Sequence, residues 1–324
     1  MADCHKQFGE FHGKIELIDS SRSKLEQGRN AIRDLIRADF KEKGRTPVPS
    51  FEEQGSWAMG TIINPLPGEE FDLDDGVYLQ NLDKKSKADW PTAETVHSWI
   101  VDAVDGHTKT PPVDKRTCVR VVYAGDYHID LPIYADLNGT NMHAVKGETG
   151  WHFSDPVEIT KWFKEAVKTN GKQLQRTVRY FKAWADFNAK DGKLPSGLIL
   201  TVLAVQNFRA NERDDKCFAD TARAIHNSIS AVFHVVNPKD ASEELTARLD
   251  ADQKKRFQDA IANLATEGQK AVDAEKTSEA SKIWKKRFGD RFPTVEDNPE
   301  AEQKKKDAER LASAYVSTKP WMPL

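Results

Sequence analysis

The segment that decides the fold is GSWAMGTIINPLPGEEFDLDDGVYL, residues 55–79, where five acidic residues crowd into the start of a strand-like run. In a strand, successive side chains point to opposite faces. In FDLDDGVYL, residues 71–79, Asp72 and Asp74 therefore share one face and apolar residues occupy the other. Two neighbouring carboxylates repel each other unless a cation lies between them. The pattern predicts a divalent-metal site on a strand.

A third carboxylate lies in a second strand-like run, YHIDLPIYA, residues 127–135. Asp130 shares a face with His128 and Tyr134, opposite an apolar face. If this strand neighbours residues 71–79, three aspartates surround one site. Mg²⁺ prefers oxygen ligands and completes its shell with substrate phosphates, and paired metals serve phosphoryl transfer. We therefore expect a nucleoside triphosphate at this site.

Two short glycine motifs, Gly55-Ser56 and Gly60-Thr61, bracket a segment just ahead of the acids. Backbone N–H groups and hydroxyls at such a turn hold phosphates, and glycine permits their close approach. Taken separately, an ordinary Gly/Ser turn and surface acids at a strand end are the alternatives. The combination with residues 127–135 favours a phosphate and metal site.

The composition excludes several classes of protein. The chain has 324 residues, of which 38% are hydrophobic, enough for one large domain or two medium ones. Its net charge of -3, from 48 basic and 51 acidic residues, argues against a surface for duplex nucleic acid. Three widely spaced cysteines argue against a disulfide framework or a four-ligand zinc site. No apolar run approaches the roughly 20 residues of a membrane span, so we expect a cytoplasmic protein.

Helical and strand patterns alternate in the first half of the chain. Residues 13–42 have apolar residues at helical spacing, as one amphipathic helix or a broken pair. Strand-like runs follow, and between them a helix is expected to begin after Pro91 and to end near Gly106.

From residue 154 onward the pattern is almost entirely helical, up to a last expected helix at residues 299–315. We therefore predict an α+β fold with two domains. Residues 1–150 would form a core with a mixed sheet and an N-terminal helix, and residues 151–324 a helical domain. The active site would lie in the cleft between them.

The motifs G-S-x-x-x-G-T, D-x-D-D-G-x-Y and H-I-D-L-P-I-Y-A together resemble the DNA polymerase β-type nucleotidyltransferases, and specifically the bacterial cGAS/DncV-like nucleotidyltransferases, or CD-NTases. The similar segments run in family order from about residue 50 to 210. The resemblance implies a polymerase β-like nucleotidyltransferase core. It also implies Asp72, Asp74 and Asp130 as catalytic acids that bind two Mg²⁺ ions, with Mn²⁺ as a second option.

The resemblance further implies which residues contact the nucleotides. Gly55 and Ser56 would hold the triphosphate, Lys182 would lie against it, and Arg120 would contact a donor base. The remaining candidates are Gln54, Ser154, Asp155 and Ser196. Asp155 is also a good helix N-cap followed by proline, so capping is the alternative for that residue.

Other polar residues receive structural interpretations. Asp75 faces away from Asp72 and Asp74 on an ideal strand and is assigned a supporting role. Arg176 and Arg179 belong to a charged helical stripe of the kind that is usually a solvated face. Cys118 is interpreted as a buried thiol, and the N-terminal Cys4-His5 pair as part of a mobile end.

The function that the resemblance implies is the joining of two nucleoside triphosphates, twice, into a cyclic dinucleotide, with ATP and GTP as the expected pair and a product like cyclic GMP-AMP. The product would be a second messenger in anti-phage defence that activates a downstream effector protein. The alternatives are a linear nucleotidyltransferase acting on an oligonucleotide or RNA end, and a catalytically inactive binding module. The intact acids argue against the inactive module, and the near-neutral charge argues against long nucleic acids. We expect a monomer that binds neither membranes nor duplex DNA.

Overall fold

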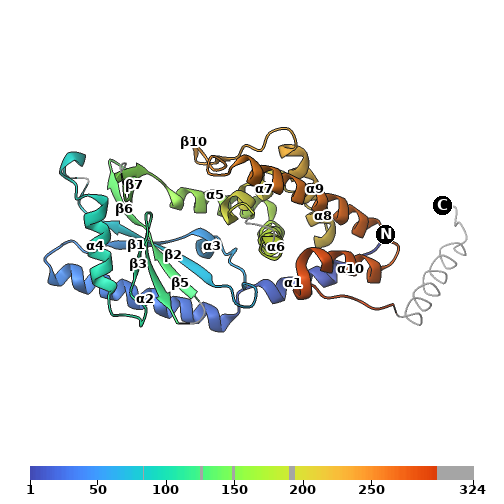
Figure 1. The fold of residues 1–324 in the computed structure, drawn as a ribbon, viewed down its shortest axis with the longest axis horizontal. Coiled ribbons are helices and arrows are strands. Elements are labelled where there is room, and N and C mark those ends of the chain that lie inside the picture. Colours follow the sequence, from blue (N-terminus) through green and yellow to red (C-terminus); the bar gives the residue numbers. More distant parts are fainter. Residues whose placement is uncertain (83, 125–126, 148–149, 190–193, 298–324) are drawn as a thin grey trace, which may run out of the picture.

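The computed structural model describes residues 1–82, 84–124, 127–147, 150–189 and 194–297, arranged as in Figure 1. A mixed sheet with its helices forms one half of the molecule, and packed helices form the other. This α+β arrangement confirms the predicted fold class. The helix expected at residues 299–315 lies outside the described residues.

The sheet has eight strands, in the order β3-β4-β5-β2-β6-β7-β8, with β1 paired to β2. They are β1 (Ser50–Gln54), β2 (Phe71–Leu79), β3 (Val113–Asp114), β4 (Val119–Tyr123), β5 (Tyr127–Leu131), β6 (Ile133–Leu137), β7 (Thr140–Val145) and β8 (Gly150–Phe153). Strand β2 lies at the centre. Val77 pairs with Phe51 of β1 and with Ile133 of β6, so β1 and β6 lie on opposite edges of β2.

The run at residues 127–135 forms two strands rather than one, because proline has no N–H group for a ladder. Both β5 and β6 run parallel to β2, and the carbonyl of Pro132 between them accepts a hydrogen bond of 2.8 Å from the N–H of Val77. The break therefore leaves the strand alignment intact. It keeps Asp130 on β5 beside the acidic part of β2.

One face of the sheet is covered by α2 (Asp19–Glu42) and α4 (Ala93–Val104) (Figure 1). Leu73 and Val77 of β2 are fully buried in this core. Helix α4 begins after Thr92, whose hydroxyl accepts a hydrogen bond from the N–H of Thr95, as expected of a threonine N-cap. Because the apolar side chains Leu73 and Val77 point to the same face of β2, this is the face of the sheet that the helices cover.

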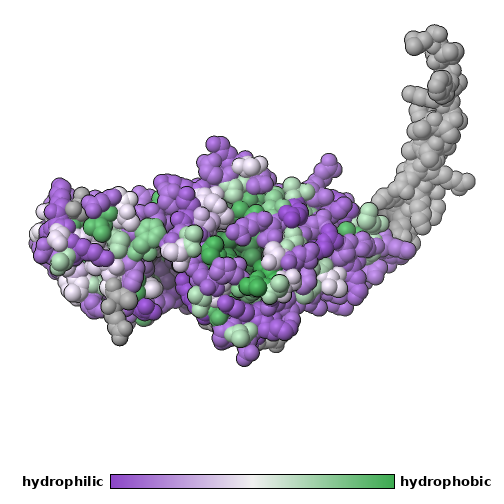
Figure 2. Space-filling view, turned by 90° about the horizontal axis from the view of Figure 1, so that it is seen from above, coloured by the Kyte–Doolittle hydropathy of each residue, from purple (hydrophilic) through white to green (hydrophobic). Residues whose placement is uncertain are grey.

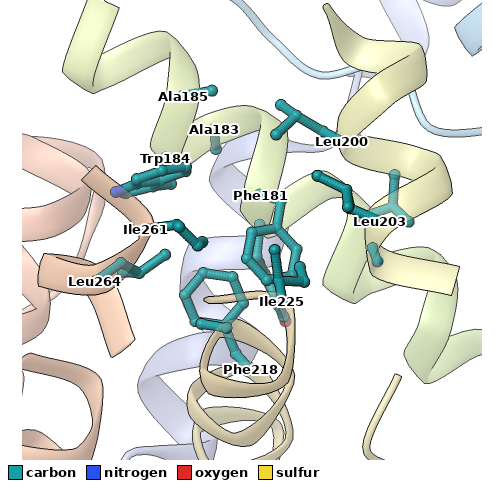
Figure 3. Close-up of a cluster of buried hydrophobic side chains, with 14 of the residues drawn as sticks. Phe181, Ala183, Trp184, Ala185, Leu200, Leu203, Phe218, Ile225, Ile261 and Leu264 are labelled. Atoms are coloured by element: carbon teal, nitrogen blue, oxygen red, sulfur yellow. The ribbon is translucent and has the colours of Figure 1, made fainter. Parts of the chain in front are cut away.

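The second core consists mainly of helices from the second half of the chain. They are α5 (Pro156–Asn170), α6 (Lys172–Asn188), α7 (Gly197–Asn207), α8 (Asp214–Ile229), α9 (Ala251–Asp273) and α10 (Thr277–Phe288). Figure 3 shows Phe181 of α6 and Phe218 of α8 packed together beside Ile261 of α9. A short hairpin of β9 (Val236–Asn237) and β10 (Asp240–Glu244) interrupts the helices and was not expected.

The N-terminal residues form the broken pair of helices, α1 (His5–Ile15) and α2, with the break at residues 16–18. Cys4 and Phe8 are fully buried in the helical core, so the expectation of a mobile N-terminal end is wrong. The reason is the apolar face of α1, which packs against aromatic residues of α10. The helical core therefore draws on the first fifteen residues as well as on the second half of the chain.

The described residues also include the short helical turns α3 (Gly55–Ala58), η1 (Lys87–Asp89) and η3 (Gly289–Arg291). Within the part of the chain that the structure describes, every helix is too short or too polar to span a bilayer.

Candidate active site

A pocket of about 570 Å³ lies between the sheet and the helical core. Its polar lining includes Gly55, Ser56, Asp72, Asp74 and Lys182. Apolar residues also line the pocket, among them Ile62, Ile159 and Leu198. On the face seen in Figure 2, hydrophobic surface gathers near the middle of the molecule, with hydrophilic residues around it. A volume of this size is typical of a small-molecule site.

The three aspartates are brought together by direct pairing of β2 with β5. In this parallel pair Asp72 aligns with His128, and Asp74 aligns with Asp130. Neighbouring strands lie about 4.8 Å apart, so the acidic residues share one small region of one sheet face. The prediction that the two strands are neighbours is confirmed.

Asp74 shows the electrostatic consequence of this clustering. Its pKa is raised from 3.8 to about 7 because the side chain is buried and because Asp72 and Asp130 place negative charge nearby. Lys182 and Arg120 partly oppose the shift. A bound cation would remove the repulsion, and carboxylate oxygens are the donors that Mg²⁺ prefers.

Arg120 holds the third aspartate in a two-bond ion pair. Its Nε and Nη2 donate to the two carboxylate oxygens of Asp130 at 2.6 and 2.7 Å, as their opposed positions on β4 and β5 allow. Among the residues that the structure describes, no three His, Cys, Asp or Glu side chains are grouped so that they could hold a metal as they stand. The carboxylates of Asp72 and Asp74 have the donor chemistry of a divalent-cation site, whereas the carboxylate of Asp130 is bonded to Arg120 in this structure.

The Gly-Ser turn lies directly against the aspartates. Helix α3 begins at Gly55, which has a positive φ of 59°, and a Cβ there would collide with the carboxylate of Asp74. Both Gly55 and Ser56 line the pocket. Glycine is thus required at this position by the backbone conformation and by the neighbouring acid.

Lys182 reaches the same pocket from α6. Its Nζ donates to the hydroxyl of Thr61 at 3.0 Å and to the Thr61 carbonyl at 3.3 Å. Burial lowers its pKa from 10.5 to about 8, although the charges of Asp72 and Asp74 act in the opposite direction. A buried lysine beside the acidic pair is well placed to meet an incoming polyphosphate.

Gln54 and Ser154 lie outside the residues that line this pocket. The amide of Gln54 is buried, donates to the Tyr78 hydroxyl at 3.0 Å and accepts from the Tyr134 hydroxyl at 3.3 Å. Ser154 hydrogen-bonds to Tyr134 as well. These contacts place both residues in a polar cluster beside the site, and their contact with a base stays a prediction.

Asp155 and Ser196 both stand at helix starts. Asp155 accepts a hydrogen bond of 3.1 Å from the N–H of Glu158, so the capping interpretation holds for α5. Ser196 precedes α7 and lines the pocket, and its hydroxyl makes no capping bond to that helix. A nucleotide contact for either residue stays a prediction.

Asp75 lies on the opposite face of β2 from the site and is fully buried. Arg33 of α2 donates to both of its carboxylate oxygens, at 2.7 and 2.5 Å. The assignment of a supporting role therefore agrees with its position. Cys118 is likewise buried, as expected.

The charged stripe on α6 is not a solvated face, contrary to expectation. Arg179 is only 6% exposed, and Arg176 is paired with buried Asp214 at 2.7 and 2.8 Å. The reason is that both guanidinium groups meet partners in the folded protein, since Arg179 donates to the Gly60 carbonyl and Arg176 pairs with Asp214 of α8. Thr61 of the Gly60-Thr61 motif lines the pocket, and its hydrogen bonds from Lys182 were not predicted.

A mixed sheet with paired aspartates on a central strand, a third on the adjacent strand and a Gly-Ser turn against them defines the class of the polymerase β-type nucleotidyltransferases. Residues 49–134 match the family described as cyclic GMP-AMP synthase DncV-like, nucleotidyltransferase domain. Residues 171–298 match the cyclic GMP-AMP synthase C-terminal domain. The chain therefore belongs to the DncV-like nucleotidyltransferases.

Several named relatives are similar over most of this chain. A cyclic GMP-AMP synthase of Escherichia albertii is 28% identical over 255 residues, which are 74% of this chain and 55% of that protein. The match thus spans about half the length of that relative. A cyclic AMP-AMP-AMP synthase of an Acinetobacter species is 24% identical and covers 89% of this chain and 85% of its own length.

Solved structures of the cyclic AMP-GMP synthase DncV of Vibrio cholerae have the same fold. One superposes with a TM-score of 0.77 at 20% identity and covers 91% of this chain and 98% of that chain. Another holds a linear intermediate, 5' pppA(3',5')pG, and has a TM-score of 0.75 at 20% identity, covering 90% of this chain and 97% of that chain.

Proposed function

We propose that this protein is a nucleotidyltransferase that joins two nucleoside triphosphates into a cyclic dinucleotide. The observation that carries the proposal is the alignment of Asp74 with Asp130 on adjacent strands, where Asp74 lines the pocket together with Asp72, Gly55 and Lys182. Family membership supports the same reaction.

Asp72 and Asp74 would hold divalent metal, with Asp130 joining them after its pair with Arg120 opens. We propose two Mg²⁺ ions. When bound, such ions neutralise phosphate charge and lower the pKa of an attacking hydroxyl.

The residues of the chain have separate tasks in this scheme. Gly55 and Ser56 would hold the triphosphate through backbone N–H groups and the hydroxyl, and Lys182 would balance its charge. Asp130 would help to take the proton from the attacking ribose hydroxyl. The apolar residues that line the pocket offer a surface for a base.

The choice of bases is the finer part of the proposal. Relatives are named as synthases of cyclic GMP-AMP, cyclic AMP-AMP-AMP and, in Roseivirga ehrenbergii, c-di-GMP. We propose ATP and GTP, because the cyclic GMP-AMP synthase of Escherichia albertii has the highest identity of these three relatives. Arg120, Gln54 and Ser196 are the residues that we propose to contact bases, and Ser154 and Asp155 are proposed to contact the nucleotide. The product would act as a second messenger in anti-phage defence, through an effector protein.

The proposal is tested by incubating the protein with Mg²⁺ and labelled ATP, GTP, CTP and UTP, followed by nuclease and phosphatase digestion and mass identification. A phosphatase-resistant cyclic product containing AMP and GMP is expected from the wild type. Replacement of both acids, Asp72→Ala with Asp74→Ala, should abolish it.

Two other results would replace the proposal with an alternative. Products that lengthen an added RNA primer would favour the linear nucleotidyltransferase. Unchanged nucleotides with Mg²⁺ or Mn²⁺ present would favour a binding module.

A further inference from the structure

One face of α6 contacts three consecutive carbonyl groups of the chain that leads out of the Gly-Ser turn. Gln175 Nε2 donates to the Met59 carbonyl at 2.9 Å, and Arg179 Nη2 donates to the Gly60 carbonyl at 2.7 Å. Lys182 then donates to the Thr61 carbonyl at 3.3 Å. Positions 175, 179 and 182 lie on one helical face, so a single stripe of α6 meets the segment in order.

The N–H groups of the same segment are bonded in the other direction. Met59 N donates to the Gly55 carbonyl at 3.2 Å, and Thr61 N donates to the Ser56 carbonyl at 2.8 Å. Gly60 N donates to the Trp57 carbonyl at 2.9 Å. Each of the three residues therefore donates its N–H to the turn that begins at Gly55 and accepts a bond from α6 at its carbonyl.

Arg179 is the most constrained donor of the three. Its guanidinium is buried, contacts His12 Nε2 at 2.7 Å and pairs with Glu16 at 3.1 Å. Glycine at position 60 makes the approach possible, since it has a φ of 62° and a Cβ there would lie 2.6 Å from Gln175 Nε2. The side chains of α6 and this segment therefore fit each other closely.

We propose that Gln175 and Arg179 are positioning residues, which fix residues 59–61 and thereby set the Gly55-Ser56 turn for the triphosphate. The inference rests on the proposed function for its kinetic part only. Neither residue has to touch a nucleotide, because each acts through a backbone carbonyl. Loss of either donor would leave a carbonyl without its partner and free the turn to move.

Arg176 provides a matched control on the same helix. It is one turn from Arg179, and its guanidinium pairs with Asp214 inside the helical half rather than with the turn. Arg176→Met and Arg179→Met each remove one arginine from α6. Only the second removes a contact to residues 59–61.

Hydrogen exchange tests the inference independently of catalysis. In the unliganded protein, Arg179→Met should speed exchange of the amides of residues 59–61 by roughly tenfold or more, the factor that corresponds to loss of one hydrogen bond from a charged donor. Arg176→Met should leave these amides at the wild-type rate. Gln175→Ala, at a half-buried position, should also speed their exchange and serves if Arg179→Met does not fold.

Kinetics separate positioning from general destabilisation. Arg179→Met should raise the KM for the triphosphate by roughly tenfold, whereas a loss of folded protein would lower apparent kcat and leave KM unchanged. Arg179→Lys, which keeps a charged donor, should recover part of the loss. Equal exchange and equal KM in Arg179→Met and Arg176→Met would overturn the inference. If the wild type makes no product, the proposed function fails, and the exchange data still decide between the two outcomes.

Discussion

Gly55 is the residue at which backbone conformation and site chemistry meet. Its positive φ of 59° is costly for any residue with a side chain, and the Asp74 carboxylate occupies the place where a Cβ would lie. Gly44 has a similar φ of 66° but open space around it. Substitutions at these two glycines can therefore distinguish the cost of backbone strain from damage to the site.

Gly55→Ala should abolish most cyclic product, whereas Gly44→Ala should retain it. Both variants should lose about 1 kcal/mol of stability from the left-handed backbone. Only Gly55→Ala also displaces Asp74, and a shift of about 1 Å at a reacting group can cost roughly 100-fold in rate. Product formation and urea unfolding of both variants check this. Comparable activity in the two variants would contradict the assigned role of Gly55.

At the scale of single residues, the sequence predicted the acidic face because strand parity depends only on position along the chain. Asp72 and Asp74 on one face, and Asp75 on the other, follow from a period of two. The partner of each acid could not be predicted this way. Arg120 on Asp130, and Gln54 between two tyrosines, depend on which strands pair and in what register.

Among the elements, α2 is joined to the central strand β2 by the ion pair of Arg33 with buried Asp75. The carboxylate of Asp75 is fully buried, while Arg33 also lies over the ring of Phe51, 5.4 Å from its centroid. Arg37 lies over the same ring at 5.0 Å, but its ion pair with Asp34 is on the surface. Helix α2 thus has one arginine paired with a buried aspartate and one arginine paired with an exposed aspartate.

Arg33→Met should destabilise the protein by about 3 to 5 kcal/mol, because it leaves the charge of Asp75 buried without a partner. Arg37→Met should cost less than about 1 kcal/mol, since it loses an exposed ion pair. Urea unfolding gives both free energies of unfolding. The double variant Arg33→Met with Asp75→Asn should recover part of the lost stability. A small effect of Arg33→Met alone would show that the ion pair does not hold α2 to β2.

Elements with strong local signals were predicted well, and elements set by tertiary contacts were not. The start of α4 follows from Thr92 and its bond to Thr95. The β9-β10 hairpin has one strand of only two residues, too short for a periodic signal. The burial of α1 was not predicted, because the helices that cover its apolar face lie in the second half of the chain.

At the scale of the whole molecule, α1 at the start of the chain packs against α10. Phe8 of α1 lies 5.1 Å from Trp284 and 5.8 Å from Phe288 of α10, measured between ring centroids. It also lies 5.1 Å from Tyr180 of α6. The two halves are therefore linked by a chain segment that begins in one core and continues along the other.

Phe8→Ala should lower the free energy of unfolding by about 3 to 5 kcal/mol, as expected for a buried aromatic residue. Phe153→Ala is the control, because Phe153 is 47% exposed and its loss should change stability by less than about 0.5 kcal/mol. Equilibrium denaturation measures both. If the two variants were equally stable, α1 would not be an integral part of the helical core.

The junction of the two halves should also make stability depend on pH. His12 lies there beside Arg179, and burial together with that cation lowers its pKa below 6.5, although Glu16 acts in the opposite direction. Arg176 and Asp214 also act on the ring, with opposite signs. As pH falls below about 6.5, the unfolded chain takes up a proton that the folded protein resists, so stability declines.

The slope from this one group can reach at most about 1.4 kcal/mol per pH unit, and it should vanish above pH 7.5, where both states hold a neutral ring. His12→Gln keeps an acceptor for Arg179 but cannot titrate. Its free energy of unfolding, measured by urea between pH 8 and pH 5, should therefore fall less steeply than that of the wild type. Parallel curves would show that the proton is taken up elsewhere. If the two curves differ only below pH 6.5, the acid-sensitive contact lies at His12, where α1 and α6 meet the segment of residues 59–61.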